Sequence, residues 1–159
     1  MKKIRDLMFS KVITVQRRTT LKQLLQNFAA FHTFPIVPVV EEDNTLVGVI
    51  SLKNLIKILK PMEPKTLKAI PFLDEKPVEI PEVEITREIS QLIVADDIMD
   101  TKFVVVDEEM TDDQAFKLMR LHDSEQVPVV DKDKKFKGIV GIFDIVVNIF
   151  IERGVLKKR

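Results

Sequence analysis

The sequence VPVV at positions 37–40, followed by Gly48, returns as VPVV at positions 127–130, followed by Gly138. Three pairs of residues share an offset of 90 positions: Pro38 and Pro128, Gly48 and Gly138, and Asn54 and Asp144. Three anchors at one spacing indicate that the chain is a duplicated unit. Every other residue is therefore interpreted by its place within the repeat.

Both repeats predict the element order β-α-β-β-α. In the first, the β-branched run Val12–Val15 favours a strand, and Thr20 with Gln23 forms a capping box that starts a helix. This helix is expected to end near Thr33, because Pro35 disfavours helical geometry in the preceding residues. In the rest of the first repeat, strands are expected at 36–40 and 46–50 and a helix at 52–60. In the second repeat, strands are expected at 103–106, 127–130 and 136–140. Its helices are expected from Thr111 to near His122 and at 143–153. Since Pro38 has no N–H, its strand is expected at a sheet edge or a bulge.

The stretch between the repeats is rich in proline. Residues 61–81 hold five of the chain's eight prolines, which prevent long helices and favour an extended path. The sequence divides into a first repeat at 1–60, a connector at 61–96 and a second repeat at 97–159. We expect the connector to be ordered and to hold a short helix at 87–93.

The bulk composition excludes several classes of protein. Lys and Arg number 25 against 25 Asp and Glu, so there is no basic surface of the kind that nucleic acid requires. The absence of cysteine rules out disulfides and thiolate metal sites, and two histidines without a carboxylate cluster predict no metal site. The most apolar run, 139–151, contains Asp144 and Asn148 and is shorter than the roughly 20 residues that span a membrane. With no signal-peptide pattern, the sequence predicts a soluble cytoplasmic protein.

These features resemble the cystathionine-β-synthase (CBS) domain, present as a tandem pair. The resemblance rests on Asp-Leu/Ile-Met at 6–8 and 97–99, a Thr before the first helix, Pro-Val-Val, a Gly ten residues later, and Asp or Asn six residues beyond that. It implies an α/β (α+β) fold in which two β-α-β-β-α repeats pack pseudo-symmetrically through their sheets. It also implies two clefts between the repeats for adenosine-containing ligands such as AMP, ADP, ATP or S-adenosylmethionine. Such pairs commonly form homodimers and regulate an enzyme or a transporter.

In this family the last helix often begins Ser/Thr-x-x-Asp, where the hydroxyl serves phosphate and the carboxylate holds the ribose hydroxyls. The N–H groups of a helix N-terminus favour phosphate, and a carboxylate accepts from two neighbouring hydroxyls. The motif is split here, because the first repeat has Ser51 and Asn54 whereas the second has Gly141 and Asp144. The resemblance favours Asp144 as the ribose ligand over a first-turn acid that suits the helix dipole. Ser51 and Asn54 are explained equally well as the cap of their helix.

Further candidate ligand contacts that the resemblance implies are Ile13, Thr14, Val37, Lys53, Val127 and Phe143. Each also has a simpler interpretation. Ile13 and Thr14 are ordinary strand formers, and the two valines suit a core. Lys53 suits a solvated surface, and Phe143 suits packing in the core or at an interface.

Two functions fit the sequence. The first is a non-enzymatic module that binds an adenosine-containing ligand and signals to a partner. The second is a ligand-independent dimerisation or interaction module, favoured by the split motif and by the apolar closing helix with Ile149 and Phe150. An enzyme is disfavoured, since no nucleophile–base pair or phosphate-cradling Gly-rich loop is present.

Overall fold

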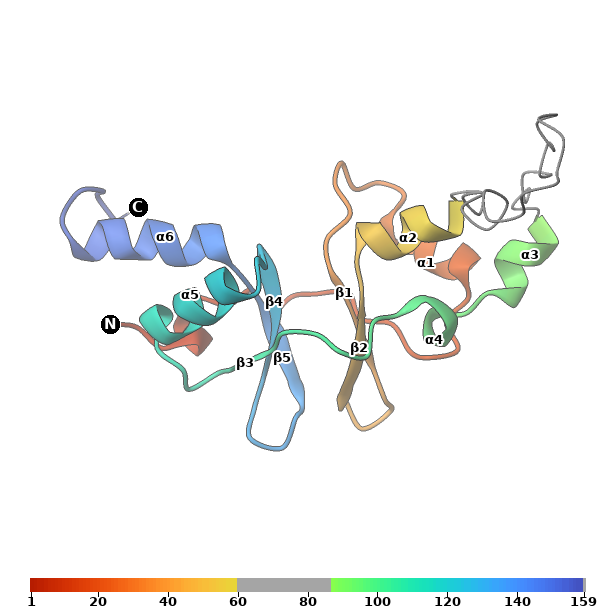
Figure 1. The fold of residues 1–159 in the computed structure, drawn as a ribbon, viewed down its shortest axis with the longest axis horizontal. Coiled ribbons are helices and arrows are strands. Elements are labelled where there is room, and N and C mark those ends of the chain that lie inside the picture. Colours follow the sequence, from red (N-terminus) through yellow and green to blue (C-terminus); the bar gives the residue numbers. More distant parts are fainter. Residues whose placement is uncertain (60–86, 159) are drawn as a thin grey trace, which may run out of the picture.

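The computed structural model describes residues 1–59 and 87–158 and consists of two helix-flanked sheets that face each other (Figure 1). Its elements in chain order are η1 (Ile4–Asp6), α1 (Leu21–Phe28), β1 (Val37–Val40), β2 (Leu46–Ile50), α2 (Leu52–Leu59), α3 (Arg87–Leu92), α4 (Ala95–Ile98), β3 (Val106–Asp107), α5 (Asp112–Leu121), β4 (Gln126–Val130), β5 (Phe136–Gly141) and α6 (Ile142–Glu152). The short helix expected in the connector is confirmed as α3. Residues 60–86 lie outside the described residues, and with them most of the connector that was expected to be ordered.

The two sheets share one construction. β1 and β2 pair antiparallel, as do β4 and β5, and β3 adds a parallel strand beside β4. A register shift falls between Val39 and Val40 and recurs between Val129 and Val130, which is the same repeat position. On the side of β1 that faces away from β2, Pro38 acts only as a hydrogen-bond acceptor, because its carbonyl accepts from Val15 N–H at 3.0 Å. The missing N–H of Pro38 is therefore tolerated there. Both expectations for this strand, an edge and a bulge, are therefore confirmed.

The strand expected over Val12–Val15 is shorter than predicted, and only Val15 pairs, in a parallel bridge with Val39. Its counterpart in the second repeat is also displaced, to β3 at Val106–Asp107. The physical reason is the path of the chain, because residues 9–14 cross from the second repeat to the first. A segment that passes between two sheets lies alongside neither for long enough to build a ladder.

Helix α1 ends at Phe28, earlier than the expected end near Thr33. The capping box is confirmed, with Thr20 accepting from Gln23 N–H at 3.2 Å. Beyond the helix, Phe31 N–H turns back to Phe28 O at 3.0 Å, and the two rings pack edge to face with centroids 5.1 Å apart. This aromatic contact stabilises a turn directly after Phe28. The helix therefore ends before it reaches the residues that Pro35 was expected to exclude from helical geometry.

The start of each repeat packs on the other repeat. Residues 2–9, here called the first leader, place Ile4 in the core of the second repeat, where its N–H donates to Met110 O at 2.9 Å. Residues 93–100, the second leader, place Ala95 in the core of the first repeat, and its N–H donates to Thr19 O at 2.8 Å. The leaders are thus exchanged, so the packing units cross the boundaries of the sequence repeats.

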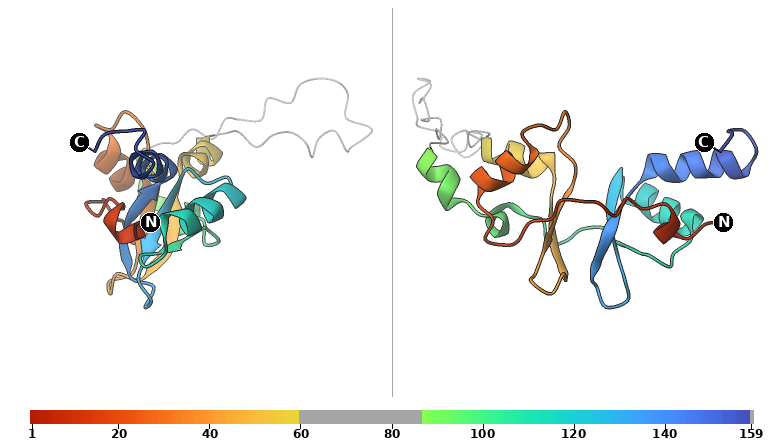
Figure 2. Two further views of the ribbon diagram at one scale, coloured as in Figure 1. Left: turned by 90° about the vertical axis from the view of Figure 1, so that its left-hand side faces the viewer. Right: turned by 180° about the vertical axis from the view of Figure 1, so that it is seen from behind.

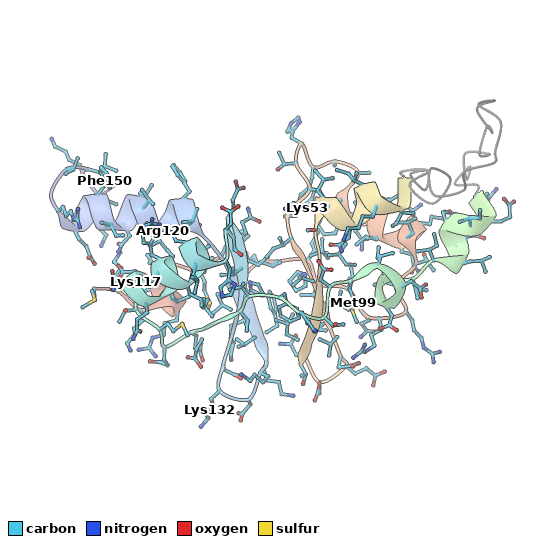
Figure 3. All side chains as sticks on the ribbon, in the orientation of Figure 1. Lys53, Met99, Lys117, Arg120, Lys132 and Phe150 are labelled. Carbon is cyan, nitrogen blue, oxygen red and sulfur yellow. The ribbon has the colours of Figure 1, made fainter. Side chains whose placement is uncertain are left out.

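Each leader also adds an edge pair to the opposite sheet. Phe9 pairs with Ile139 and Asp100 pairs with Val49, both antiparallel. The two glycines of the repeat lie under these crossings. A Cβ on Gly138 would meet Phe9 O at 2.6 Å, and one on Gly48 would meet the side chain of Met99, which lies beside β2 (Figure 3). At Gly138 a side chain is excluded because the backbone of Phe9 passes directly over it, whereas at Gly48 the space is filled mainly by the side chain of Met99.

A third core joins the two sheets, and the views in Figure 2 show the repeats packed side by side. Its buried members are Val40, Leu46, Val130 and Phe136. At one end of this core the two β-turns bond to each other, with Leu46 N–H donating to Lys134 O at 3.1 Å and Phe136 N–H donating to Asn44 O at 3.0 Å. The predicted pseudo-symmetric packing through the sheets is confirmed.

An ion pair lies beside the paired turns. Lys135 Nζ donates to Asp43 Oδ2 at 2.8 Å and to Thr45 Oγ1 at 3.0 Å. The hydrogen bond from Lys135, with further bonds from Thr45, lowers the pKa of the Asp43 carboxyl to about 2. The pair therefore links the turn of one repeat to the turn of the other.

Candidate functional site

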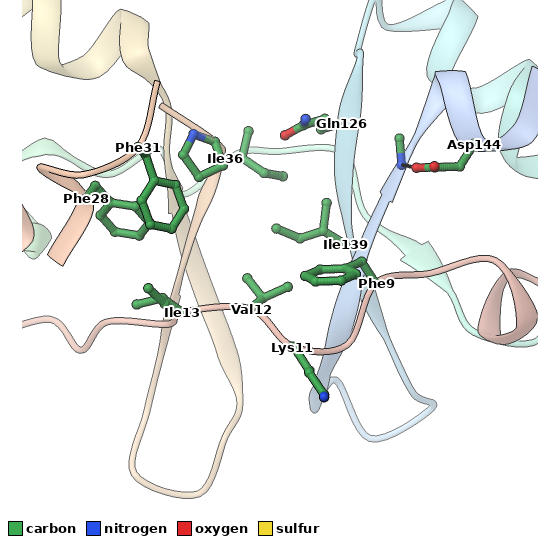
Figure 4. A pocket seen from close by; sticks show the side chains of 12 residues that line it. Phe9, Lys11, Val12, Ile13, Phe28, Phe31, Ile36, Gln126, Ile139 and Asp144 are labelled. Carbon is green, nitrogen blue, oxygen red and sulfur yellow. Dashed lines mark hydrogen bonds between the residues drawn. The ribbon is translucent and has the colours of Figure 1, made fainter. Parts of the chain in front are cut away.

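A cleft of about 500 Å³ lies between the two repeats (Figure 4). Its apolar lining consists of Phe9, Val12, Ile13, Phe28, Phe31, Pro35, Ile36 and Ile139. Its remaining lining residues are Lys11, Gln126, Gly141 and Asp144. Both repeats and the crossing after the first leader contribute to its walls. The exchange of the leaders therefore builds this cleft, since it carries residues 9–13 across the gap.

Asp144 stands at the edge of the cleft, in the first turn of α6. Its Oδ2 accepts from Gly141 N–H at 3.1 Å, so the carboxylate caps the helix start, and the side chain is exposed. Oδ1 adds a second acceptor atom with its own lone pairs. Two acceptor atoms on one exposed carboxylate suit a pair of neighbouring hydroxyls. Asp144 and Gly141, the two motif residues of the second repeat, both line the cleft.

Ser51 and Asn54 stand at the same repeat positions but are engaged differently. Asn54 Oδ1 accepts from Ser51 N–H at 2.6 Å and from Ser51 Oγ at 2.8 Å. The side chain of Asn54 is buried, with 5% exposure. Of the two interpretations left open for this pair, the hydrogen bonds match capping of α2. Neither residue lines the 500 Å³ cleft.

The other predicted contacts are spread over different surroundings. Ile13 lines the cleft, whereas Thr14 is half-buried beside it and is not part of the lining. Val37 and Val127 are fully enclosed in the first and second cores. Their side chains therefore match the core interpretation.

The last two candidates point elsewhere. Lys53 is an exposed residue of α2 (Figure 3) and matches the solvated interpretation. Phe143 is 75% exposed and lines a shallow groove between α6 and the first leader, with Lys2 and Leu7. Phe143 does not line the 500 Å³ cleft, although Asp144 lines both the cleft and this groove.

Most of the cleft lining escapes a repeat-based analysis. Phe9 and Lys11 follow the Asp-Leu-Met motif but reach the cleft only because the leaders are exchanged. Phe31 lies beyond the end of α1, in the stretch that was expected to be helical, and it faces the cleft from the first repeat (Figure 4). One signal in the sequence is that these phenylalanines are not repeated. In the first part of each repeat the offset is 91 residues, as between Asp6 and Asp97, and Phe9 and Phe31 there correspond to Asp100 and His122.

Comparison with known proteins identifies the repeats. A model of the CBS domain family matches residues 4–61 and 94–150. Among curated proteins, the chain is similar to inosine-5′-monophosphate dehydrogenase of Aquifex aeolicus (strain VF5), with 26% identity over 145 residues. This match covers 91% of the chain and 24% of the dehydrogenase, so the chain spans about a quarter of the length of that relative.

Solved structures share the fold. CBSX2 in complex with AMP superposes with a TM-score of 0.68 at 21% identity, covering 96% of this chain and 99% of that one. The CBS domain pair of protein MJ0100, in complex with 5′-methylthioadenosine and S-adenosyl-L-methionine, gives a TM-score of 0.64 at 18% identity, covering 96% and 98%. A CBS domain-containing protein of unknown function from Bacillus anthracis str. Ames Ancestor gives 0.71 at 19% identity, covering 94% and 93%. With both repeats matched, this chain belongs to the CBS domain family and carries the domain as a tandem pair.

Proposed function

We propose that this chain is a non-enzymatic regulatory module that binds an adenosine-containing ligand in the cleft beside Asp144. The observation that carries the proposal is an exposed carboxylate at the edge of an apolar cleft between the repeats. The apolar walls suit a base and the carboxylate suits the ribose hydroxyls. Similar CBS pairs in complex with AMP, or with 5′-methylthioadenosine and S-adenosyl-L-methionine, support the ligand class.

The proposed regulatory signal arises because residues from both repeats and from the crossing segment line the cleft. A ligand that touches Phe31 of the first repeat, Ile139 of the second and Phe9 of the crossing segment favours one arrangement of the three over others. A ligand shifts such an equilibrium by its difference in affinity between the arrangements. A partner that binds one arrangement better therefore binds more tightly or more weakly when the cleft is occupied. A regulated enzyme or transporter is the partner class that we propose.

Calorimetric titration of the chain with AMP, ATP and S-adenosylmethionine tests the proposal. We expect saturable binding of at least one ligand, weakened about ten- to hundredfold by Asp144→Ala, because a charge-assisted hydrogen bond is lost. Asn54→Ala is the matched control at the same repeat position and is expected to bind normally. Binding that depends on Asn54 and not on Asp144 contradicts our choice of cleft, and absence of binding contradicts the function.

A second candidate function is a ligand-independent module that dimerises through α6. It is favoured by two exposed aromatic residues of this helix, Phe143 at 75% exposure and Phe150 at 44%. Figure 3 shows Phe150 on α6. Sedimentation of Phe150→Glu separates the two functions. If Phe150→Glu abolishes a homodimer and the wild type shows no response to the ligands, the ligand-independent module is supported. If both the wild type and Phe150→Glu respond to a ligand, the ligand-binding module is supported.

A further inference from the structure

The charges in the cleft constrain the ligand that it accepts. Lys11 and Asp144 are the charged residues of the described lining, and their charges cancel. A phosphate monoester carries about −1.5 to −2 at pH 7, and each added phosphate increases that charge. A cleft with one lysine and one carboxylate therefore offers little to balance a phosphate chain. The carboxylate that would hold the ribose also repels it.

The start of α6 does not make up for the missing charge. Helix N-termini bind phosphate through unpaired N–H groups. Here Gly141 N–H donates to Asp144 Oδ2 at 3.1 Å, and Ile142 N–H donates to Glu125 O at 2.8 Å. Gly141 also lacks the hydroxyl that the motif of the family offers at this position. Two backbone donors are thus already engaged where a phosphate would need them.

The remaining surface is apolar on both sides. Phe31 and Ile36 lie on the wall of the first repeat, and Phe9 and Ile139 lie on the opposite wall (Figure 4). The side chains of Phe9 and Phe31 are exposed, at 64% and 49%. Covering such side chains favours a ligand with apolar groups in addition to its base.

We propose that the cleft selects adenosine derivatives that carry no phosphate, with a neutral or cationic group at the 5′ position. A thioether such as that of 5′-methylthioadenosine has this chemistry. This inference rests on the proposed function and narrows its ligand class. It predicts an order of affinity that falls with every phosphate added to the nucleoside.

The test is a calorimetric series with 5′-methylthioadenosine, AMP, ADP and ATP, without Mg²⁺ and at two salt concentrations. We expect 5′-methylthioadenosine to bind at least about tenfold more tightly than ATP, because unbalanced charge weakens the latter. Its affinity should also be insensitive to salt, since no net charge is neutralised.

Variants make the test specific to the cleft. Gln126→Lys adds a cation to the lining and is expected to raise the affinity for AMP and ATP while leaving that for 5′-methylthioadenosine nearly unchanged. Lys11→Ala is expected to weaken any residual ATP binding. Its matched control is Lys102→Ala, at the same repeat position but outside this cleft.

The outcomes separate this inference from the proposed function. ATP or ADP binding as tightly as 5′-methylthioadenosine overturns the inference and leaves the proposed function intact. An unchanged affinity for AMP in Gln126→Lys, with 5′-methylthioadenosine still bound, also overturns it. Absence of binding by every ligand overturns both.

Discussion

Phe9 and Ile139 exchange both of their backbone hydrogen bonds, with Phe9 N–H donating to Ile139 O at 2.8 Å and Ile139 N–H donating to Phe9 O at 2.9 Å. The two residues come from different repeats, and both line the cleft. This pair therefore fixes the chain that crosses between the sheets at the point where the ligand is proposed to bind. A change at this pair is expected to alter stability and binding together.

Gly138→Ala tests the crossing directly. The added Cβ would meet Phe9 O, a backbone atom, at 2.6 Å, so the leader must move away from β5. Overpacking of this kind costs about 1–3 kcal/mol. We expect a lower midpoint of thermal unfolding and weaker ligand binding, measured by calorimetry.

Gly48→Ala is the control for this substitution at the equivalent repeat position. Its Cβ meets mainly the flexible side chain of Met99, which can change rotamer, although Asp100 O lies 3.1 Å away. We expect a smaller loss of stability and unchanged binding beside Asp144. Equal effects of the two substitutions would contradict the role given to the Phe9 crossing.

A buried polar pair distinguishes the second repeat from the first. Asn148 Nδ2 donates to Asp112 Oδ2 at 2.9 Å, and both residues are 2% exposed. The first repeat has Leu21 and Ile58 at these positions. Asp112→Leu alone is expected to cost about 1–3 kcal/mol, because it leaves the amide of Asn148 without an acceptor.

The double variant Asp112→Leu/Asn148→Ile copies the apolar pair of the first repeat. It is expected to lie within about 1 kcal/mol of the wild type or above it, because both members of the buried pair are removed together and, in the part of the chain that the structure describes, only the N–H of the exposed residue Asp113 loses a bond, the one to Asp112 Oδ1. Chemical denaturation of the four proteins in this cycle measures the coupling. Additive losses would show that the two side chains do not act as a pair.

Asn54→Ala separates capping from ligand binding. Removal of its Oδ1 leaves Ser51 N–H without the partner it has at 2.6 Å, and the loss of such a cap costs about 0.5–2 kcal/mol. We expect the free energy of unfolding to fall by this amount while the ligand affinity is retained. A ligand affinity that falls with unchanged stability would instead make Asn54 a ligand contact.

The ion pair between Lys135 and Asp43 predicts that the stability of the fold decreases at acidic pH. The pKa of Asp43 lies at about 2, below its ordinary value of 3.8, so the pair stabilises the fold above about pH 4 and this contribution is lost as the pH falls through 2. Lys135→Met is expected to raise the pKa of Asp43, measured by NMR titration of its carboxyl carbon. Lys132→Met, in the same turn (Figure 3), is the control and should leave that pKa unchanged.

The sequence predicts the repeat, the helix starts and the paired strands because their signals are local, whereas the first strand of each repeat and the end of α1 differ from prediction. The capping boxes at Thr20 and Thr111 both form, and the offset of 90 places Gly141 and Asp144 correctly at the start of α6. The exchange of the leaders is not visible in the sequence. Asp6–Met8 and Asp97–Met99 reveal that the leaders are equivalent, but both exchanged and unexchanged packing satisfy the same apolar pattern.

The cleft was only partly predictable for the same reason. Asp144 was found through a motif, whereas Phe9 and Phe31 depend on which segments meet in space. Ser51 and Asn54 carried a plausible motif whose acceptor oxygen is already used within the helix cap. A residue type at the right spacing thus indicates a site only when its polar atoms remain available to a ligand.

The exchanged leaders also bear on how the chain is made. Ile4 is synthesised before its partners Val106 and Val140 in the core of the second repeat, which follow it by more than a hundred residues. The first repeat likewise waits for Ala95 to close its own core. Neither half can complete its core without the other, so we expect a single cooperative transition that requires both repeats to have been synthesised.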